Sequence, residues 1–193
     1  MFDSNMSNRV GGCCFWFTGL PGSGKTTLAT HLHLDLSARG VKSIVLDGDL
    51  LREGLNRDLG FSRNDRRENV RRISEVARLL VSEGYVVLVA AISPYRADRR
   101  AARDRFASAM FIEVYVATDL ATCMARDPKG LYALAQAGKI TNMTGWDDSY
   151  EYPEAPDITL NTAEHTVEQT IEQLKQTIHP AIRLVGSPTK PEP

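Results

Sequence analysis

Residues 19–26 read Gly19-Leu20-Pro21-Gly22-Ser23-Gly24-Lys25-Thr26 and match the pattern G-x-x-x-x-G-K-[ST] at every position. The apolar segment Cys13–Thr18 comes directly before them, and the helix-compatible segment Thr26–Arg39 follows. Glycines let a backbone curl until successive N–H groups point inward at phosphate oxygens. The start of the following helix adds partial positive charge. The segment therefore predicts a phosphate-binding loop (P-loop) for a nucleoside triphosphate.

The residues of this loop have distinct expected roles. Lys25 is predicted to bridge the β- and γ-phosphates of ATP, and the Thr26 hydroxyl to ligate Mg²⁺. The alternative is a glycine turn with a merely structural role. The apolar segment before the loop and the helix-compatible segment after it disfavour this alternative, because a P-loop needs both. The expected ATP-binding residues are Gly19, Leu20, Pro21, Gly22, Ser23, Gly24, Lys25, Thr26, Thr27 and Arg126.

Strand-like apolar runs alternate with helical patterns along the chain. The expected strands are Cys13–Thr18, Ser43–Leu46, Tyr85–Ala90, Phe111–Val116 and Asp157–Leu160. The expected helices are Thr26–Arg39, Arg63–Glu83, Ala97–Ala107, Leu120–Arg126 and Ala163–Ile178. Such alternation is typical of a parallel sheet covered by helices on both faces. We predict an α/β protein, a three-layer P-loop NTPase fold with a mostly parallel five-stranded sheet.

Two of these helices carry clear boundary signals. Ser62, with Asp65 three residues later, can cap the start of the helix over 63–83, which has an apolar stripe at helical spacing. The helix over 163–178 has a similar stripe, and Pro180 is expected to end it.

Composition limits the class of protein. The chain has 193 residues, of which 42% are hydrophobic and 24% charged, so one core of ordinary size can form. We expect one domain over residues 11–184 between disordered tails at 1–10 and 185–193. A net charge of −1 argues against binding to nucleic acid or to an anionic membrane. The longest apolar run, Tyr85–Ile92, is far shorter than the roughly 20 residues that span a bilayer.

The three cysteines show no metal-site or disulfide spacing. Cys13 and Cys14 are adjacent and Cys123 is remote, which favours free thiols and a reducing cytoplasmic location.

The middle of the chain is rich in arginine. Thirteen arginines, no lysine and eight acidic residues lie between Arg52 and Arg105. The planar guanidinium group suits two-pronged binding of phosphate or sulfate, although most of these arginines are expected to be solvated partners of nearby acids. The chain also has no N-K-x-D tetrapeptide of the kind that reads guanine in GTPases. These features favour a kinase with a small anionic acceptor, and they leave that acceptor open.

Two carboxylates follow the second expected strand. Asp47 and Asp49 flank Gly48 at the carboxyl edge of the predicted sheet, where ligands bind in open α/β folds. A carboxylate there could orient an acceptor hydroxyl and take its proton, or hold Mg²⁺ through water. Turn formation is the alternative for each. We predict Asp49, with Lys25, as catalytic, and either Asp47 or Asp49 as the second contact to Mg²⁺.

A longer series of motifs resembles one family. The residues that carry it are Leu46-Asp47-Gly48-Asp49, Arg52, Leu55-Asn56, Leu59-Gly60-Phe61-Ser62, Asp65-Arg66, Asn69-Val70-Arg71-Arg72, Ile92-Ser93-Pro94-Tyr95-Arg96, Arg126-Asp127-Pro128-Lys129-Gly130-Leu131-Tyr132, Thr144-Gly145, Tyr150-Glu151 and Pro153. In order and spacing they resemble adenylylsulfate kinases over about Phe15 to Leu160. The resemblance implies transfer of the ATP γ-phosphate, with Mg²⁺ as cofactor, to the ribose 3′-hydroxyl of adenosine 5′-phosphosulfate (adenylyl sulfate). The product would be 3′-phosphoadenylyl sulfate.

The resemblance also implies an acceptor site. Its residues would be Asp49, Arg52, Phe61, Arg66, Asn69, Ile92, Ser93, Lys129 and Met143. Arg52, Arg66 and Asn69 would hold the phosphosulfate and the sugar, and Phe61 would stack on the adenine.

The residues themselves are consistent with this assignment. Arg66 and Asn69, three residues apart on a predicted helix, share one face. For Arg52 and Arg66, an exposed ion pair with nearby Glu53, Asp65 or Glu68 is the alternative. We expect Arg71 and Arg72 to be ordinary surface or interface charges. For Ser93, an ordinary turn before proline is an equal alternative. We do not expect Ser93 to be a nucleophile, because no base adjoins it and direct transfer needs no covalent intermediate.

Residues 129–156 contain several glycines and prolines around a short helical piece, and we predict a lid that excludes water from the reaction. A plain surface loop is the alternative. Where the family usually reads F-T-G-I-D, this chain has Met143-Thr144-Gly145-Trp146-Asp147. Met143 would then replace a flat ring opposite the adenine by a flexible thioether. Trp146 is expected to pack in the core of the lid.

Two other functions stay open at this point. One is a P-loop kinase of another nucleotide-linked or small anionic acceptor, and the other is a non-catalytic regulatory module that binds nucleotide. The expected partners are ATP and adenylyl sulfate, without nucleic acid or membrane. A homodimer and an association with sulfate adenylyltransferase are expectations from the resemblance alone.

Overall fold

A computed structural model describes residues 12–183 of the chain, so the two predicted tails lie outside the described residues. The elements, in chain order, are β1 (Cys13–Thr18), α1 (Lys25–Ala38), β2 (Ser43–Asp47), α2 (Gly48–Glu53), α3 (Arg63–Ser82), β3 (Val86–Ala90), α4 (Arg96–Arg103), a short 3₁₀ turn (Ser108–Met110), β4 (Phe111–Val116), α5 (Leu120–Arg126), α6 (Leu131–Gln136), β5 (Ile158–Leu160) and α7 (Val167–Arg183).

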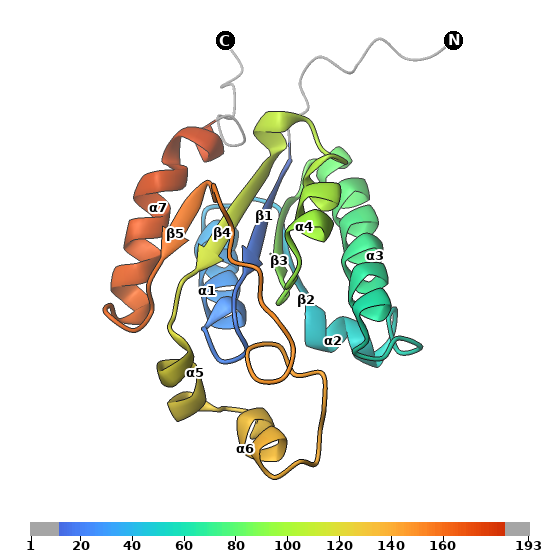
Figure 1. The fold of residues 1–193 in the computed structure, drawn as a ribbon. Coiled ribbons are helices and arrows are strands. Elements are labelled where there is room, and N and C mark those ends of the chain that lie inside the picture. The colour runs from blue at the N-terminus through green and yellow to red at the C-terminus, as the bar shows by residue number, and fades with distance from the viewer. Residues whose placement is uncertain (1–11, 184–193) are drawn as a thin grey trace, which may run out of the picture.

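The five strands form one sheet in the order β2-β3-β1-β4-β5, and every neighbouring pair is parallel. Figure 1 shows α3 and α4 together on one side of this sheet, and α2, α5 and α6 beyond the carboxyl ends of the strands. The predicted five-stranded α/β fold is confirmed, with a sheet that is parallel throughout. None of the helices within residues 12–183 combines the length and the apolar character that a bilayer crossing requires.

The central strand β1 explains why helices cover both faces of the sheet. Cys13, Phe15 and Phe17 pack with α1 and α7 on one face, whereas Cys14 and Trp16 pack with α3 and α4 on the other. All five side chains are buried, because successive residues of a strand point to opposite faces. A strand with two buried faces therefore needs the continuous apolar run seen in the sequence.

The predicted cap of α3 is confirmed. The Ser62 hydroxyl accepts a hydrogen bond from the backbone N–H of Asp65 (3.2 Å), and the Asp65 carboxylate accepts one from the backbone N–H of Ser62 (3.3 Å). Such caps contribute about 1 kcal/mol each to helix stability. This one fixes where α3 begins, and α3 carries residues of the cavity described below.

The short helix α2 was not predicted. Turn formation was the alternative role for Asp47 and Asp49. The Asp47 carboxylate instead accepts hydrogen bonds from the backbone N–H groups of Asp49 (2.8 Å) and Leu50 (3.2 Å) and so caps a helix. The same residue type favours turns and helix starts for the same reason, since its side chain bonds to nearby N–H groups.

Two helix ends differ from the prediction. The prediction that Pro180 ends the last helix is wrong: α7 begins at Val167, later than expected, and continues to Arg183. Proline lacks an N–H donor, but its fixed φ is compatible with a helix, so it removes one bond without ending the helix at that residue. Helix α4 ends at Arg103, earlier than predicted, where the chain turns so that Phe106 packs against Phe111.

Candidate active site

A cavity of about 780 Å³ lies at the carboxyl edge of the sheet. The P-loop, α2, the start of α3, the loop after β3 and the segment after α5 all contribute to its wall. The predicted site residues that line it are Pro21, Gly22, Gly24, Lys25, Thr26, Thr27, Asp49, Arg52, Phe61, Arg66, Asn69, Ile92, Ser93, Arg126 and Lys129. The predicted residues outside its lining are Gly19, Leu20, Ser23, Asp47 and Met143. One cavity thus brings together most residues of the two predicted sites.

The P-loop has the curled backbone that its glycines allow. Gly22 has φ 78°, and a Cβ atom at this position would lie 3.0 Å from the carbonyl oxygen of Cys123. Beneath the loop, Nζ of Lys25 donates to the carbonyl oxygens of Gly19 (3.0 Å) and Leu20 (2.7 Å). Burial lowers the pKa of Lys25 from 10.5 to about 8, partly offset by the negative charge of Asp49. The lysine is therefore held at the loop in a site with few water contacts.

Two oxygen groups beside the loop fit a magnesium ion. The Thr26 hydroxyl at the start of α1 donates a hydrogen bond to Oδ2 of Asp47 at the end of β2 (2.6 Å). Mg²⁺ prefers oxygen ligands, keeps several waters and usually takes one or two carboxylates together with substrate phosphates. Asp47 and Thr26 supply a hard donor set of this kind next to the P-loop.

Phe61 marks the opposite side of the cavity. Its ring is 54% exposed, with the guanidinium carbons of Arg52 and Arg66 at 4.5 and 5.6 Å from the ring centroid. Arg52 also donates to the carbonyl oxygens of Leu59 (3.1 Å) and Gly60 (3.0 Å), which holds the loop before Phe61 in place. The structure therefore combines an accessible aromatic face with two fixed positive charges.

Arg66 does not form the exposed ion pair with a neighbouring acid that was its alternative role. The side chain is buried, and its Nε donates to the carbonyl oxygen of Phe61 (3.1 Å). It also donates to the carbonyl oxygen of Asn142 and pairs with Asp148 (3.3 Å). Because both partners belong to the predicted lid, Arg66 connects the cavity to that segment.

Asn69 depends on a residue that we did not predict as part of the site. Its Oδ1 accepts a hydrogen bond from Nδ2 of Asn56 (2.9 Å), and both side chains are buried. The bond fixes the orientation of the Asn69 amide, whose NH₂ group is the part that can donate to a ligand. Asn56 belongs to the motifs of the resemblance, but nothing in the local pattern signals a contact thirteen residues away.

Asp49 and Lys129 both line the cavity and form an ion pair between α2 and the beginning of the predicted lid. Both side chains are exposed, and Asp49 raises the pKa of Lys129. The pair places a carboxylate at the edge of the cavity that the P-loop also lines.

Ser93 lines the cavity, but its hydroxyl is used within the protein. Its Oγ accepts a hydrogen bond from the indole Nε1 of Trp16 (2.9 Å), and the residue is buried with φ 46°. This geometry favours a structural role for the hydroxyl and agrees with the expectation that Ser93 is not a nucleophile.

Comparison with known proteins identifies a family for the chain. A sequence model of the family described as "Adenylylsulphate kinase" matches residues 11–161. The chain belongs to the adenylylsulphate kinase family. An adenylyl-sulfate kinase of Yersinia pestis is 58% identical over 163 residues, which make up 84% of this chain and 76% of that protein. These kinases depend on ATP, so the chain is an ATP-dependent phosphotransferase of this family.

Solved structures of adenylylsulphate kinases agree with the fold. The Mycobacterium tuberculosis APS kinase CysC in complex with AMPPNP and APS superposes with a TM-score of 0.84 and 46% identity, covering 88% of this chain and 98% of that one. A hexameric APS kinase from Thiobacillus denitrificans gives a TM-score of 0.66 and 30% identity, covering 90% of this chain and 30% of that one.

This adenylylsulphate kinase differs from the prediction in its lid. Met143 is buried in a cluster with Leu20, Tyr132 and Tyr150; Tyr132 lines the cavity, but Met143 does not. The prediction that Trp146 packs in the core of the lid is wrong, because its side chain is 44% exposed.

The turn before Trp146 packs closely on the P-loop. Gly145 has φ 87°, and a Cβ atom there would lie 2.8 Å from Cδ2 of Leu20. The backbone at Gly145 therefore lies directly against the side chain of Leu20. The hydroxyl of Tyr132 also donates to the carbonyl oxygen of Pro21 (3.1 Å), so the predicted lid contacts the P-loop.

Arg126 lines the cavity and is connected to the P-loop through Thr162. It donates to the hydroxyl (2.8 Å) and the carbonyl oxygen (2.6 Å) of Thr162, whose hydroxyl donates to the carbonyl oxygen of Ser23 (2.9 Å). Thr162 and the following residues 165–167 line the cavity beside the P-loop and were not predicted. They follow the last strand, where the sequence has no motif that signals a nucleotide site.

Proposed function

We propose that this chain transfers the γ-phosphate of ATP to the ribose 3′-hydroxyl of adenosine 5′-phosphosulfate, which yields ADP and 3′-phosphoadenylyl sulfate. One observation carries the proposal: a single cavity has the P-loop on one side and the Arg52–Phe61–Arg66 group on the other. A donor phosphate and an anionic acceptor can therefore meet without crossing bulk water.

The P-loop side of the cavity would bind ATP. Backbone N–H groups of the loop hold the phosphates, and the ammonium group of Lys25 exchanges its carbonyl partners for β- and γ-phosphate oxygens. Thr26 would hold Mg²⁺, with Asp47 acting directly or through water. Bound there, Mg²⁺ neutralises charge on the phosphates.

Transfer needs no covalent enzyme intermediate. The bond between the γ-phosphorus and the bridging oxygen breaks, its electron pair leaves with ADP, and a bond from the ribose O3′ to phosphorus forms. Asp49 lies at the cavity edge beside the P-loop and orients the attacking hydroxyl, and its carboxylate takes the proton released from O3′. Lys129, paired with Asp49, keeps the carboxylate in position.

The other side of the cavity would recognise the acceptor. The exposed ring of Phe61 offers a face for the adenine, and the guanidinium groups of Arg52 and Arg66 offset the two negative charges of the phosphosulfate. The NH₂ group of Asn69 adds a donor on the same face of α3 as Arg66. Met143 is buried in the cluster with Leu20, Tyr132 and Tyr150 and does not line the acceptor side of the cavity.

Turnover with defined acceptors tests the proposal. The purified protein is mixed with ATP, Mg²⁺ and either adenosine 5′-phosphosulfate, AMP or adenosine, and nucleotide products are separated by anion-exchange chromatography. We expect 3′-phosphoadenylyl sulfate and an equal amount of ADP. Phosphorylation of another acceptor alone would support the kinase of a different anion, and nucleotide binding without any turnover would support the regulatory module.

Assembly and location are further parts of the proposal. We propose self-association, a property that the hexameric Thiobacillus denitrificans relative supports, and light scattering of the purified chain tests it. We also propose an association with sulfate adenylyltransferase, an enzyme whose product would be the acceptor, and co-purification of the two proteins tests it.

A cytoplasmic location is proposed because all three cysteines are free and buried.

A further inference from the structure

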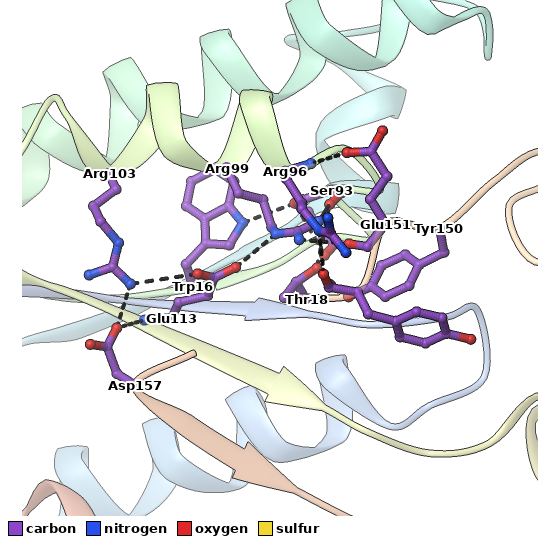
Figure 2. Close-up of polar contacts among 12 residues, drawn as sticks. Trp16, Thr18, Ser93, Arg96, Arg99, Arg103, Glu113, Tyr150, Glu151 and Asp157 are labelled. Carbon is purple, nitrogen blue, oxygen red and sulfur yellow. Dashed lines mark hydrogen bonds and ion pairs between the residues drawn. The ribbon is translucent and has the colours of Figure 1, made fainter. Parts of the chain in front are cut away.

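Arg99 is a buried cation outside the cavity lining. It lies on α4, on the side that faces the sheet, and is only 3% exposed. Figure 2 shows its side chain pointing from α4 toward the strands, between those of Arg96 and Arg103. A buried guanidinium group is costly unless its donors are satisfied, so its partners indicate what it holds together.

Three segments of the chain meet at this side chain (Figure 2). Nε of Arg99 donates to Oε1 of Glu113 on β4, Nη1 to the carbonyl oxygen of Ser93, and Nη2 to the carbonyl oxygen of Glu151, each at 2.7 Å. These partners lie on the central sheet, on the loop after β3 and at the end of the predicted lid. The planar guanidinium group can satisfy all three at once because its donors point in fixed, different directions.

The loop after β3 forms part of the cavity wall, and its backbone is held in an unusual shape. Residues 91–94 line the cavity, and Ser93 has φ 46°, which is uncommon for a residue other than glycine. Trp16 bonds to the Ser93 hydroxyl (2.9 Å), and the Thr18 hydroxyl donates to the carbonyl oxygen of Ile92 (2.7 Å). Arg99 adds the bond to the Ser93 carbonyl oxygen. Such conformations persist only where the surroundings hold them.

The same cation holds the end of the lid segment. The backbone N–H of Glu151 donates to the carbonyl oxygen of Pro94 (2.8 Å), so the two segments that Arg99 joins also bond to each other. The ring of Tyr150 lies below the guanidinium group, with its centroid 5.7 Å from the guanidinium carbon. The hydroxyl of Tyr150 is 2.9 Å from that of Thr18. Arg99 thus sits where the acceptor-side wall and the lid are joined.

We propose that Arg99 is a positioning residue for the acceptor: it holds the loop at Ser93 and the end of the lid at Glu151 in the arrangement that binds the anionic acceptor. The proposal rests on the proposed function. It assigns Arg99 no contact with substrate, because its side chain does not line the cavity. Loss of Arg99 therefore weakens acceptor binding more than ATP binding.

Arg103 provides a matched control on the same helix. It lies one turn further along α4 and pairs with Glu113 (3.6 Å) and Asp157 (2.5 Å). It also donates to the carbonyl oxygen of Phe111 (3.2 Å). None of these partners belongs to the loop after β3 or to the lid. Arg103→Met thus removes a guanidinium group from the same helix, one that is 30% exposed, without touching either segment.

The experiment compares the wild type, Arg99→Met, Arg99→Lys, Arg103→Met and the double variant Arg99→Met/Glu113→Met by steady-state kinetics and thermal unfolding. We expect Arg99→Met to raise the acceptor KM by about tenfold or more, with the ATP KM within about twofold of the wild type. Arg99→Lys should give a smaller increase. Arg99→Met leaves Glu113 without this partner and should lower the unfolding temperature. The double variant removes both members of the ion pair, so its unfolding temperature should rise again while the acceptor KM stays high.

Several results would overturn the proposal. They are an unchanged acceptor KM in Arg99→Met, a return of the acceptor KM to the wild-type value in the double variant, and an equal increase in Arg103→Met.

Hydrogen exchange separates this proposal from the proposed function. Arg99→Met should speed amide exchange in residues 91–95 and 149–152 together, whereas Arg103→Met should not. This readout needs no turnover, so it applies even if the wild type fails to phosphorylate adenosine 5′-phosphosulfate, a result that would overturn the proposed function alone. Unchanged exchange in both segments would overturn the role of Arg99 alone.

Discussion

Replacement of Arg66 by alanine removes a guanidinium group that reaches both the acceptor side of the cavity and the lid. The side chain is buried beside Phe61 and bonds to carbonyl oxygens of Phe61 and Asn142 and to the carboxylate of Asp148. A hydrogen bond with a charged group contributes about 1.5–3 kcal/mol. The loss of one such bond to the acceptor predicts a decrease in its kcat/KM of about 10- to 150-fold.

The assay measures initial rates with each substrate varied in turn. We expect the loss in Arg66→Ala to fall on the acceptor, with the ATP KM nearly unchanged, because no ATP-binding residue is among the hydrogen-bond and ion-pair partners described for Arg66. Arg71→Ala is the control, since Arg71 is exposed on the same helix and pairs with Glu68 (2.7 Å). Thermal unfolding of both variants shows whether the lost contacts to the lid also lower stability.

Two results would refute this reasoning. The first is an acceptor kcat/KM in Arg66→Ala that equals the value in Arg71→Ala. The second is a rise in the ATP KM as large as that in the acceptor KM, which would mean that Arg66 acts on the whole cavity and not on the acceptor side.

The remaining predictions concern the P-loop and the lid. Since the pKa of Lys25 is lowered to about 8, its ammonium form is lost as pH rises through that value, so kcat/KM for ATP should fall above about pH 8; a flat profile to pH 10 would contradict this. Gly145→Ala should lower the free energy of unfolding more than Gly138→Ala in chemical denaturation, because both glycines have positive φ but only a Cβ at Gly145 meets Leu20, at 2.8 Å. The φ strain alone should cost about 1 kcal/mol. Met143→Phe should lower stability by about 1–3 kcal/mol through overpacking and leave the acceptor KM unchanged; a lower acceptor KM would show that residue 143 reaches the acceptor.

Much of the fold was predictable because its signals are local. The apolar run of β1, the stripe and capping box of α3 and the alternation of strands and helices depend on residues close together in sequence. The errors in the predicted elements arise because one local sequence pattern is compatible with more than one structure. A carboxylate that caps α2 has the sequence pattern of a turn, and Pro180 within α7 has the pattern of a helix end.

The residues of the functional site also differ in how far the local sequence predicts them. The P-loop was predicted from eight consecutive residues, since the backbone of a short segment forms the phosphate site by itself. The acceptor residues were expected only from the resemblance to a family. Their placement together depends on α2, α3 and the loop after β3 meeting at one edge of the sheet.

The sequence by itself thus determined the class of fold, the donor end of the cavity and the residues worth testing. Only the tertiary structure decided that the Ser93 hydroxyl binds Trp16, that Arg66 binds the lid and that Arg99 joins three segments. These partners lie far apart in the chain, and neither periodicity nor a motif encodes such pairs. They arise because a parallel sheet brings the ends of distant strands to one edge, where the side chains that share a space must satisfy one another's hydrogen bonds.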